Sequence, residues 1–187
     1  VRVDRLRVLC RDADEARAHL LLAARLDSDA SRAVTVRTIV DGEVVAELDR
    51  RVATGLNEVA WNVDIGDPAL WWPRGRGEQH LTTVAVEIVV DGERSDRRKR
   101  RTGLRTVAWD DWKCSVNGER LFIKAANVLP SRADLAHATR ADQELLVERA
   151  IETGLDGLRV HGHIAPRALY AAADQAGLLL LQDFPLQ

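Results

Sequence analysis

The sequence contains 187 residues, enough for one or two domains that each bury a hydrophobic core. Apolar residues make up 46% and charged residues 30%, as in an ordinary globular protein, and no run of about 18 apolar residues predicts a membrane span. The formal net charge of -2 gives no support for binding to nucleic acid or to a membrane surface.

The two cysteines, Cys10 and Cys114, are far apart in the sequence and match no metal-binding spacing. We expect free thiols in a reducing compartment, with a single long-range disulfide as the alternative. No signal peptide opens the chain, and we expect a cytoplasmic protein whose signal region, if it has one, lies outside this segment. Because the sequence begins at Val1 without methionine and ends at Gln187 directly after a predicted strand, we expect an excised fragment.

Residues 1–108 have the pattern of an all-β domain. Asp41-Gly42 suits a two-residue hairpin, because a type I′ turn needs positive φ at both central positions. A longer loop that begins with Asp91-Gly92 is predicted before the last strand. About seven short strands with regular turns are typical of an immunoglobulin-like β-sandwich. The predicted strands cover residues 1–8, 18–26, 34–40, 43–48, 56–63, 82–90 and 98–107.

The charged segment 93–101 has two interpretations. It resembles a basic patch that binds nucleic acid or heparin. The alternative is a solvated loop and edge strand that charge keeps from aggregating. Because the net charge is close to zero and no aromatic residues are interleaved, we favour the second interpretation.

Trp71 and Trp72 are adjacent in a loop framed by glycine and proline. An exposed indole there could stack on a sugar ring. Packing against the sandwich or a neighbouring domain is the commoner use of so much apolar area, and we favour it.

Residues 109–187 have a mixed pattern. Thr139 and Asp142 resemble a capping box at the start of a helix. The order of elements predicts the first three strands of a (β/α)8 TIM barrel, and the barrel is incomplete because a whole one needs about 250 residues. The predicted elements are a hairpin around Asn117-Gly118, a helix between Thr139 and Gly154, a strand over 157–161, a helix from Pro166 to Gly177 and a strand over 178–181.

Polar residues follow two predicted barrel strands. His161 and His163 are one residue apart, and with Asp183 they form a candidate metal site, since neutral imidazole and carboxylate suit zinc. The alternative, which we favour, is that these histidines bond to substrate or backbone. Arg159 lies inside a strand, and a buried guanidinium needs a carboxylate partner. This pairing would either tie strands together or hold a catalytic carboxylate ionised.

Several motifs in order resemble glycoside hydrolase family 2, in particular its β-mannosidase branch. The resemblance covers nearly the whole chain. The matching segments are Leu70-Trp71-Trp72-Pro73 through Gln79, residues 102–107, Val116-Asn117-Gly118, residues 122–130, Leu158-Arg159-Val160-His161-Gly162, residues 174–178 and Leu181-Gln182-Asp183-Phe184-Pro185.

The resemblance implies a retaining enzyme that removes terminal β-linked mannose with two glutamates. Both glutamates follow later barrel strands, so it implies that no catalytic residue lies in this chain. Arg159 matches an arginine of the second barrel strand, and Asn127 and Asp183 match polar positions near the sugar pocket. His161 stands where the family usually has tryptophan, so the substrate is open. His163, Val128, Leu181 and Asp156 also depart from the family pattern.

We therefore predict a fragment of a retaining exo-β-glycosidase, β-mannosidase-like, in which 1–108 is the immunoglobulin-like sandwich and 109–187 begins the barrel. Asn127, Arg159, His161 and Asp183 are predicted to bind substrate or support the active site, without metal or cofactor. The expected partner is an oligosaccharide and not nucleic acid or membrane. The fragment itself is expected to be inactive and either to self-associate or to be marginally stable. The alternatives are a metal-dependent barrel hydrolase and a non-catalytic carbohydrate-binding module.

Overall fold

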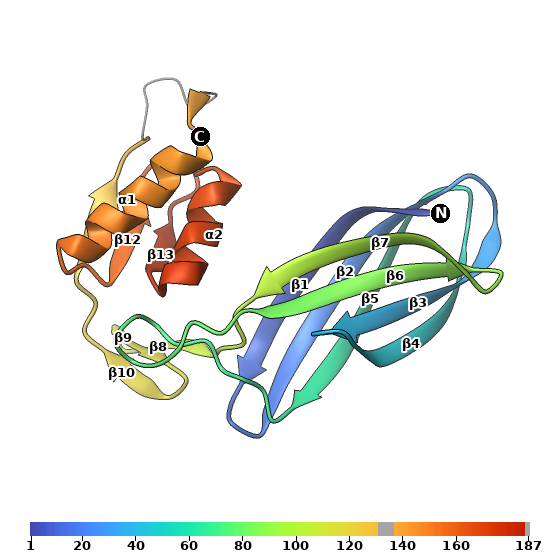
Figure 1. Ribbon diagram of the computed structural model, residues 1–187, viewed down its shortest axis with the longest axis horizontal. Helices are drawn as coiled ribbons and strands as arrows, with labels where there is room; N and C mark the ends of the chain where they lie inside the picture. The colour runs from blue at the N-terminus through green and yellow to red at the C-terminus, as the bar shows by residue number, and fades with distance from the viewer. Residues whose placement is uncertain (131–136, 186–187) are drawn as a thin grey trace. The chain divides into compact units, whose positions relative to one another are not determined.

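The computed structural model describes residues 1–130 and 137–185 (Figure 1). The chain divides into two compact units. The first consists of residues 1–70 and 81–106, and the second of residues 71–80 and 107–187. Within the described ranges, no helix is both long enough and apolar enough to cross a lipid bilayer.

The first unit is an antiparallel β-sandwich. Its two sheets have the strand orders β1-β2-β5 and β4-β3-β6-β7, and every neighbouring pair is antiparallel (Figure 1). The strands are β1 (Arg2–Ala13), β2 (Arg17–Ser28), β3 (Arg32–Val40), β4 (Glu43–Val52), β5 (Gly55–Gly66), β6 (Thr82–Val90) and β7 (Glu93–Thr102).

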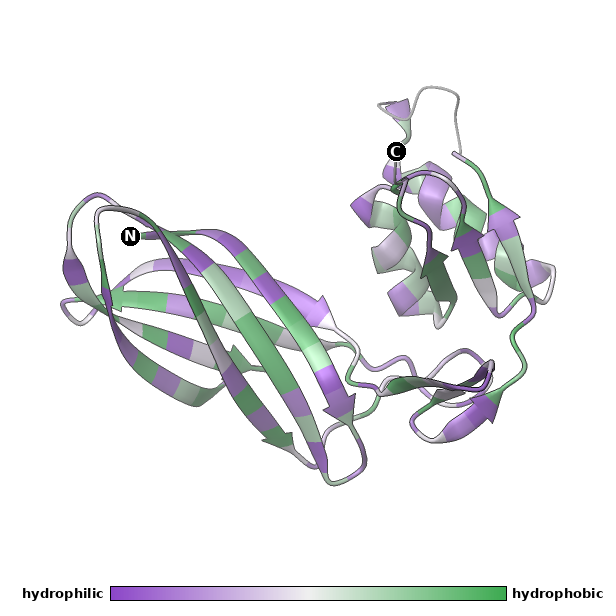
Figure 2. Ribbon diagram, turned by 180° about the vertical axis from the view of Figure 1, so that it is seen from behind, coloured by the Kyte–Doolittle hydropathy of each residue, from purple (hydrophilic) through white to green (hydrophobic). Residues whose placement is uncertain are grey.

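The core of the sandwich follows from alternation along the strands. In β2, every second residue from Ala18 to Ser28 is buried, because successive side chains point to opposite faces of a sheet. Figure 2 shows the same alternation of hydrophobic and hydrophilic residues. Buried residues of both sheets form one hydrophobic cluster. Across it, the indole Nε1 of Trp61 donates to Oγ1 of Thr38 at 2.9 Å, so both buried polar groups are paired.

The prediction of a long loop after Asp91 is wrong. Asp91 and Gly92 both have positive φ, 50° and 84°, and they form the whole connection between β6 and β7. The charged segment 93–101 therefore lies entirely within the edge strand β7. A two-residue turn suffices because both residues adopt the left-handed conformation that a type I′ hairpin needs.

Part of this charge neutralises a buried carboxylate. Glu87 is only 6% exposed. Its carboxylate oxygens lie 3.2 Å from Arg97, 3.6 Å from Arg94 and 3.7 Å from Arg37. A carboxylate removed from water needs such partners to remain ionised. Arg94 and Arg97 of the segment are therefore accounted for by ion pairing within the sheet.

Side chains of β7 and the segment after it join the edges of the two sheets. Oδ2 of Asp96 accepts the amide hydrogen of Val3 at 2.7 Å, and Nε of Arg98 donates to the carbonyl of Val3 at 3.0 Å. Near the other end of β1, Oγ1 of Thr106 accepts from the amide of Ala13 at 2.7 Å. These bonds satisfy backbone groups of β1 that no neighbouring strand reaches on this side.

The second unit contains a small antiparallel sheet and a parallel β/α portion. The antiparallel sheet has the order β10-β9-β8, and the parallel sheet has the order β11-β12-β13. Helices α1 and α2 cover one face of the parallel sheet (Figure 1). The elements are β8 (Val107–Asp110), β9 (Lys113–Val116), β10 (Glu119–Leu121), β11 (Ala125–Val128), α1 (Arg140–Glu152), β12 (Gly157–Val160), α2 (Arg167–Ala176) and β13 (Leu179–Gln182).

The ends of both helices follow the sequence signals. Thr139 and Asp142 form the predicted capping box, with each side chain accepting from the other residue's amide. Gly154 and Gly177 both have φ of 75°, the left-handed conformation typical of a residue that ends a helix. Pro166 is the N-cap of α2 and not a residue of its first turn, so the helix begins one residue later than predicted.

Residues 71–80 belong to the second unit, although their place between two strands of the sandwich predicted that they belong to the first domain. Trp71 is 1% exposed, and its Nε1 donates to the carbonyl of Asp174 in α2 at 2.7 Å. The amide of Arg74 donates to the carbonyl of Gly177 at 2.9 Å. Trp71 therefore has the packing role that we favoured over stacking on a sugar.

Candidate functional site

The parallel sheet places two predicted site residues and one leucine in one row across its three strands. Asn127 of β11 is paired with Arg159 of β12, and Arg159 with Leu181 of β13. Residues paired in this way point to the same face of a sheet. Val128 and Val160, one position further along, point to the opposite face and are buried beneath the helices. The row that contains Arg159 therefore lies on the face that α1 and α2 do not cover.

The ladder continues for one residue beyond each strand end. The amide of His161 donates to the carbonyl of Val128, and the amide of Asp183 donates to the carbonyl of Val160, both at 3.1 Å. His161 and Asp183 are each two residues beyond a member of the first row. They therefore fall on the same uncovered face, at the carboxyl ends of the strands.

Arg159, His161 and Asp183 form a bonded cluster. Nε of Arg159 lies 3.2 Å from Oδ1 of Asp183, and its Nη2 lies 2.7 Å from Oδ2. This two-pronged contact fixes the plane of the carboxylate. Nδ1 of His161 lies 3.2 Å from the same Oδ2. One carboxylate thus holds both neighbouring side chains, and we call these three residues the Arg159 cluster.

The expectation that Arg159 is buried is wrong. Its side chain is 45% exposed, and the side chains of His161 and Asp183 are 52% and 32% exposed. Arg159 lies on the face of the sheet that the helices do not cover. The sequence alone does not reveal which face of a parallel strand the helices cover. The expectation of a carboxylate partner is nevertheless confirmed by the contact with Asp183.

The cluster holds Asp183 in its charged form. Hydrogen bonds from Arg159 and then from His161 lower the pKa of the Asp183 carboxyl below its ordinary value. Both bonds favour the ionised form, and they outweigh the partial loss of water around the group. A carboxylate that stays ionised is a dependable acceptor for the imidazole N–H.

The lowered pKa predicts a pH dependence of stability. The stabilising contribution of Asp183 is fully present above the ordinary pKa of about 3.9 and is lost as the pH falls through the lowered value in the folded protein. We expect the free energy of unfolding of Asp183→Asn to lie below that of the wild type near neutral pH. The gap should shrink as the pH falls below about 4. Urea unfolding across this range measures it, and a gap that stays constant down to strongly acidic pH would contradict the assignment.

His163 and Gln182 shape the loop after β12. Nδ1 of His163 donates to the carbonyl of His161 at 3.0 Å, and Nε2 of Gln182 donates to the carbonyl of His163 at 2.7 Å. The hydroxyl of Tyr170 donates in turn to Oε1 of Gln182. Sequence reasoning missed Gln182 and Tyr170 as supports. The sequence did contain one indication of this role for Gln182. Because Gln182 directly precedes Asp183 in the sequence, its side chain points to the opposite face of the sheet, which the helices cover.

The structure does not support the metal site formed by His161, His163 and Asp183. The Nδ1 of His163 is bonded to backbone, and Asp183 already accepts from two side chains. Over residues 1–130 and 137–185, no three histidine, cysteine or acidic side chains are grouped closely enough to hold a metal ion. Asn127 lies beside Arg159 in the row but makes no hydrogen bond to the cluster within these ranges.

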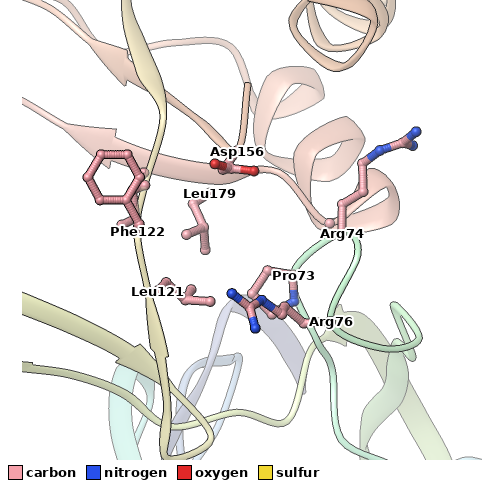
Figure 3. A pocket seen from close by; sticks show the side chains of 9 residues that line it. Pro73, Arg74, Arg76, Leu121, Phe122, Asp156 and Leu179 are labelled. Atoms are coloured by element: carbon pink, nitrogen blue, oxygen red, sulfur yellow. The ribbon is translucent and has the colours of Figure 1, made fainter. Parts of the chain in front are cut away.

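A separate pocket lies near the opposite ends of the strands. It is lined in part by Pro73, Leu121, Asp156 and Leu179, whose side chains surround the space in Figure 3. Asp156 accepts from the amide of Lys124 at 3.0 Å, so it connects the segment before β11 to the start of β12. Because Leu179 begins β13 and Asp183 follows its end, this pocket is distinct from the Arg159 cluster.

The exposed tryptophans give a further surface in the second unit. Trp112 is 94% exposed and Trp109 is 57% exposed, on the sheet that contains β8 and β9. Trp112 has φ of 65° in the turn between these strands, so the turn itself presents the indole outward. Neither residue is near the carboxyl ends of the parallel strands in the sequence.

Comparison with known proteins gives the family. The model of glycosyl hydrolases family 2 matches residues 1–105, more than half of the chain. The solved β-D-mannosidase of Dictyoglomus thermophilum is similar with a TM-score of 0.82 and 28% identity, covering 98% of this chain and 24% of that one. The exo-chitosanase of Amycolatopsis orientalis is similar with a TM-score of 0.81 and 26% identity, covering 95% of this chain and 22% of that one. The chain belongs to glycosyl hydrolase family 2, which confirms the resemblance found in the sequence.

Curated relatives agree with this assignment. β-Mannosidase A of Aspergillus terreus is 30% identical in an alignment of 182 residues, and the match covers 85% of this chain and 19% of that protein. Exo-β-D-glucosaminidase of Amycolatopsis orientalis is 29% identical in an alignment of 172 residues, and the match covers 88% of this chain and 16% of that protein. The chain thus spans less than a fifth of the length of these two relatives.

Proposed function

We propose that the chain is a fragment of a retaining exo-β-glycosidase that resembles the β-mannosidases and removes terminal β-linked sugars from oligosaccharides. In this proposal, residues 1–108 form an immunoglobulin-like sandwich and residues 109–187 supply the first three strands of a (β/α)8 barrel. The fragment contributes one wall of the sugar site. Its proposed substrate-binding and supporting residues are Asn127, Arg159, His161 and Asp183.

The observation that carries the proposal is the Arg159 cluster on the uncovered face of the parallel sheet. Barrel enzymes hold their chemistry at the carboxyl ends of the strands, and Asp183 and His161 follow two such ends. The cluster offers carboxylate, guanidinium and imidazole groups, all partly exposed. Groups of this kind exchange hydrogen bonds with sugar hydroxyls and fix the orientation of a sugar ring.

The catalytic pair belongs outside this chain in the proposal. A retaining glycosidase needs two carboxyl groups about 5–5.5 Å apart across the scissile bond. Glu144, Glu148 and Glu152 are exposed on α1, which covers the opposite face of the sheet, and Glu119 lies in β10. None of these four follows the end of a parallel strand. We therefore expect the 187-residue chain by itself to show no turnover.

The binding-module alternative is less well supported. It requires Trp71 and Trp72 to present their rings to a sugar. Trp71 is 1% exposed and bonded to Asp174, and Trp72 packs so closely on Gly77 that a methyl group there would come within 2.7 Å of the indole. Trp71 therefore offers no open face for stacking on a sugar, and Gly77 occupies space against the Trp72 ring.

Hydrolysis of a substrate panel tests the proposal. The full-length protein that contains this chain should hydrolyse an aryl β-D-mannoside or another terminal β-glycoside such as an aryl β-D-glucosaminide. Proton NMR during the reaction should show the β-anomer of the sugar released first. The separate 187-residue chain serves as the matched control and should release none. Initial release of the α-anomer, or turnover by the short chain, would contradict the proposal.

A further inference from the structure

His161 has two ring nitrogens in different surroundings. Nδ1 is bonded to Asp183, whereas no hydrogen bond reaches Nε2 from any residue that the structure describes. Its side chain is 52% exposed on the uncovered face. The ring therefore has one fixed edge and one edge that is open to a ligand.

The cluster determines which nitrogen carries the hydrogen of the neutral ring. An ionised carboxylate can only accept, so Nδ1 must be the donor to Oδ2 of Asp183. A neutral imidazole has a single N–H, which leaves Nε2 as an acceptor. Arg159 contacts both oxygens of Asp183 and so fixes the orientation of the carboxylate that orients the ring.

We propose that His161 contacts the substrate through Nε2 and accepts a hydrogen bond from a hydroxyl or ammonium group of the sugar, while Asp183 and Arg159 are positioning residues. This inference rests on the proposed glycosidase function and adds a substrate class to it. A neutral sugar or an amino sugar offers such a donor. A sugar carboxylate offers no such donor, and at this position it would meet the Nε2 lone pair.

Two substitutions distinguish the contribution of Nδ1 to activity from that of Nε2. In His161→Asn the side-chain amide reaches the place of Nδ1, and in His161→Gln it extends to the place of Nε2. We expect kcat/KM of the full-length enzyme on its best aryl glycoside to fall about 10- to 100-fold in His161→Asn, the effect of one lost hydrogen bond. The loss in His161→Gln should be smaller. Equal losses, or a larger loss in His161→Gln, would overturn the inference.

Deoxy substrates identify the bonded group. We expect the loss caused by His161→Asn to disappear on the one deoxy or deamino analogue that lacks the donor, because that interaction is already absent. A loss of the same size on every analogue would show a structural role only and would overturn the proposal. Comparing hydroxyl with ammonium at that position distinguishes the two donors.

The first unit contains a matched control. Nδ1 of His19 lies 2.7 Å from Oδ1 of Asp64, a similar histidine–carboxylate pair between two strands of the sandwich. His19→Asn should leave kcat/KM unchanged. A loss equal to that of His161→Asn would show that any histidine–carboxylate pair affects activity through folding, and it would overturn the assignment.

Imidazole nitrogen NMR tests the geometry independently of catalysis. In the neutral form, the 187-residue chain should show the hydrogen of His161 on Nδ1, and Asp183→Ala should convert this to a mixture of both tautomers. The signals of His19 should not change. Hydrogen on Nε2 in the wild type would overturn the positioning role of Asp183. This result stands even if the substrate panel finds no glycosidase activity, so failure of the inference and failure of the proposed function are distinguishable.

Discussion

Trp71→Ala should lower the free energy of unfolding of the second unit by about 3–5 kcal/mol, the usual cost of removing a large buried aromatic side chain. The indole is 1% exposed, and its Nε1 donates to the carbonyl of Asp174 at 2.7 Å. Alanine would leave a cavity and remove this bond. Urea unfolding followed by far-ultraviolet circular dichroism measures the change, with the signal of α1 and α2 reporting on this unit.

Trp112→Ala is the matched control. Trp112 is 94% exposed and is also a tryptophan of the second unit. Its removal should change the free energy of unfolding by less than about 0.5 kcal/mol, as is usual for surface substitutions. If the two variants lost the same stability, the packing role of Trp71 would be refuted, and the attachment of residues 71–80 to the second unit would need another explanation.

Gly177→Ala should also be strongly destabilising, by about 2–5 kcal/mol. Two effects add at this position. Its φ of 75° is unfavourable for an L-residue by roughly 1–2 kcal/mol. A Cβ would also lie 2.6 Å from the backbone nitrogen of Arg74, so the backbone would have to move, and such overpacking costs roughly 1–3 kcal/mol.

Gly154→Ala isolates the first of these effects. Gly154 has the same φ of 75°, but a Cβ there would meet nothing within 4 Å. We expect a loss of only about 1–2 kcal/mol, from the backbone conformation alone. The difference between the two variants therefore measures the close approach of residues 71–80 to the end of α2. Equal losses would show that this approach contributes nothing to stability.

Strands of the sandwich that bury one face, such as β2, were predictable from the alternation of apolar and polar residues. Alternation in β2 fixes which residues point inward, and Asp41-Gly42 marks a hairpin that the structure confirms with φ of 46° and 102°. The length of β7 was not predictable. Its sequence has no alternation of apolar and polar residues, and its charged residues are held in a strand by pairing with β6 and by the buried carboxylate of Glu87.

The attachment of residues 71–80 could not be found from local sequence. These residues lie between two strands of the first unit, and their contacts are with Asp174 and Gly177, about a hundred positions later. The two tryptophans indicated that the loop packs against another surface, but no periodic pattern in the sequence identifies that surface. Such contacts between distant segments are determined by tertiary structure.

The clustering of three of the four candidate residues was predictable, but the geometry of their contacts was not. Polar residues that follow apolar parallel strands indicate a shared sheet edge, which brings Arg159, His161 and Asp183 together. The family resemblance selected His161 and not His163 for the predicted site, but it did not indicate what either ring bonds to. Only the structure shows that His163 bonds to backbone while His161 bonds to the carboxylate. It also shows that Arg159 is exposed, because the helices cover the opposite face.

The measurement that tests the account most directly is a crystal structure of the full-length protein with the terminal sugar of its substrate bound. We predict that the sugar lies over the uncovered face of β11, β12 and β13, with a ring substituent at hydrogen-bonding distance from Nε2 of His161. Asp183 should still accept from Nδ1 of His161 and from Arg159. A sugar bound instead on the sandwich of the first unit, or on Trp109 and Trp112, with the Arg159 cluster left in contact with solvent, would contradict the proposed site.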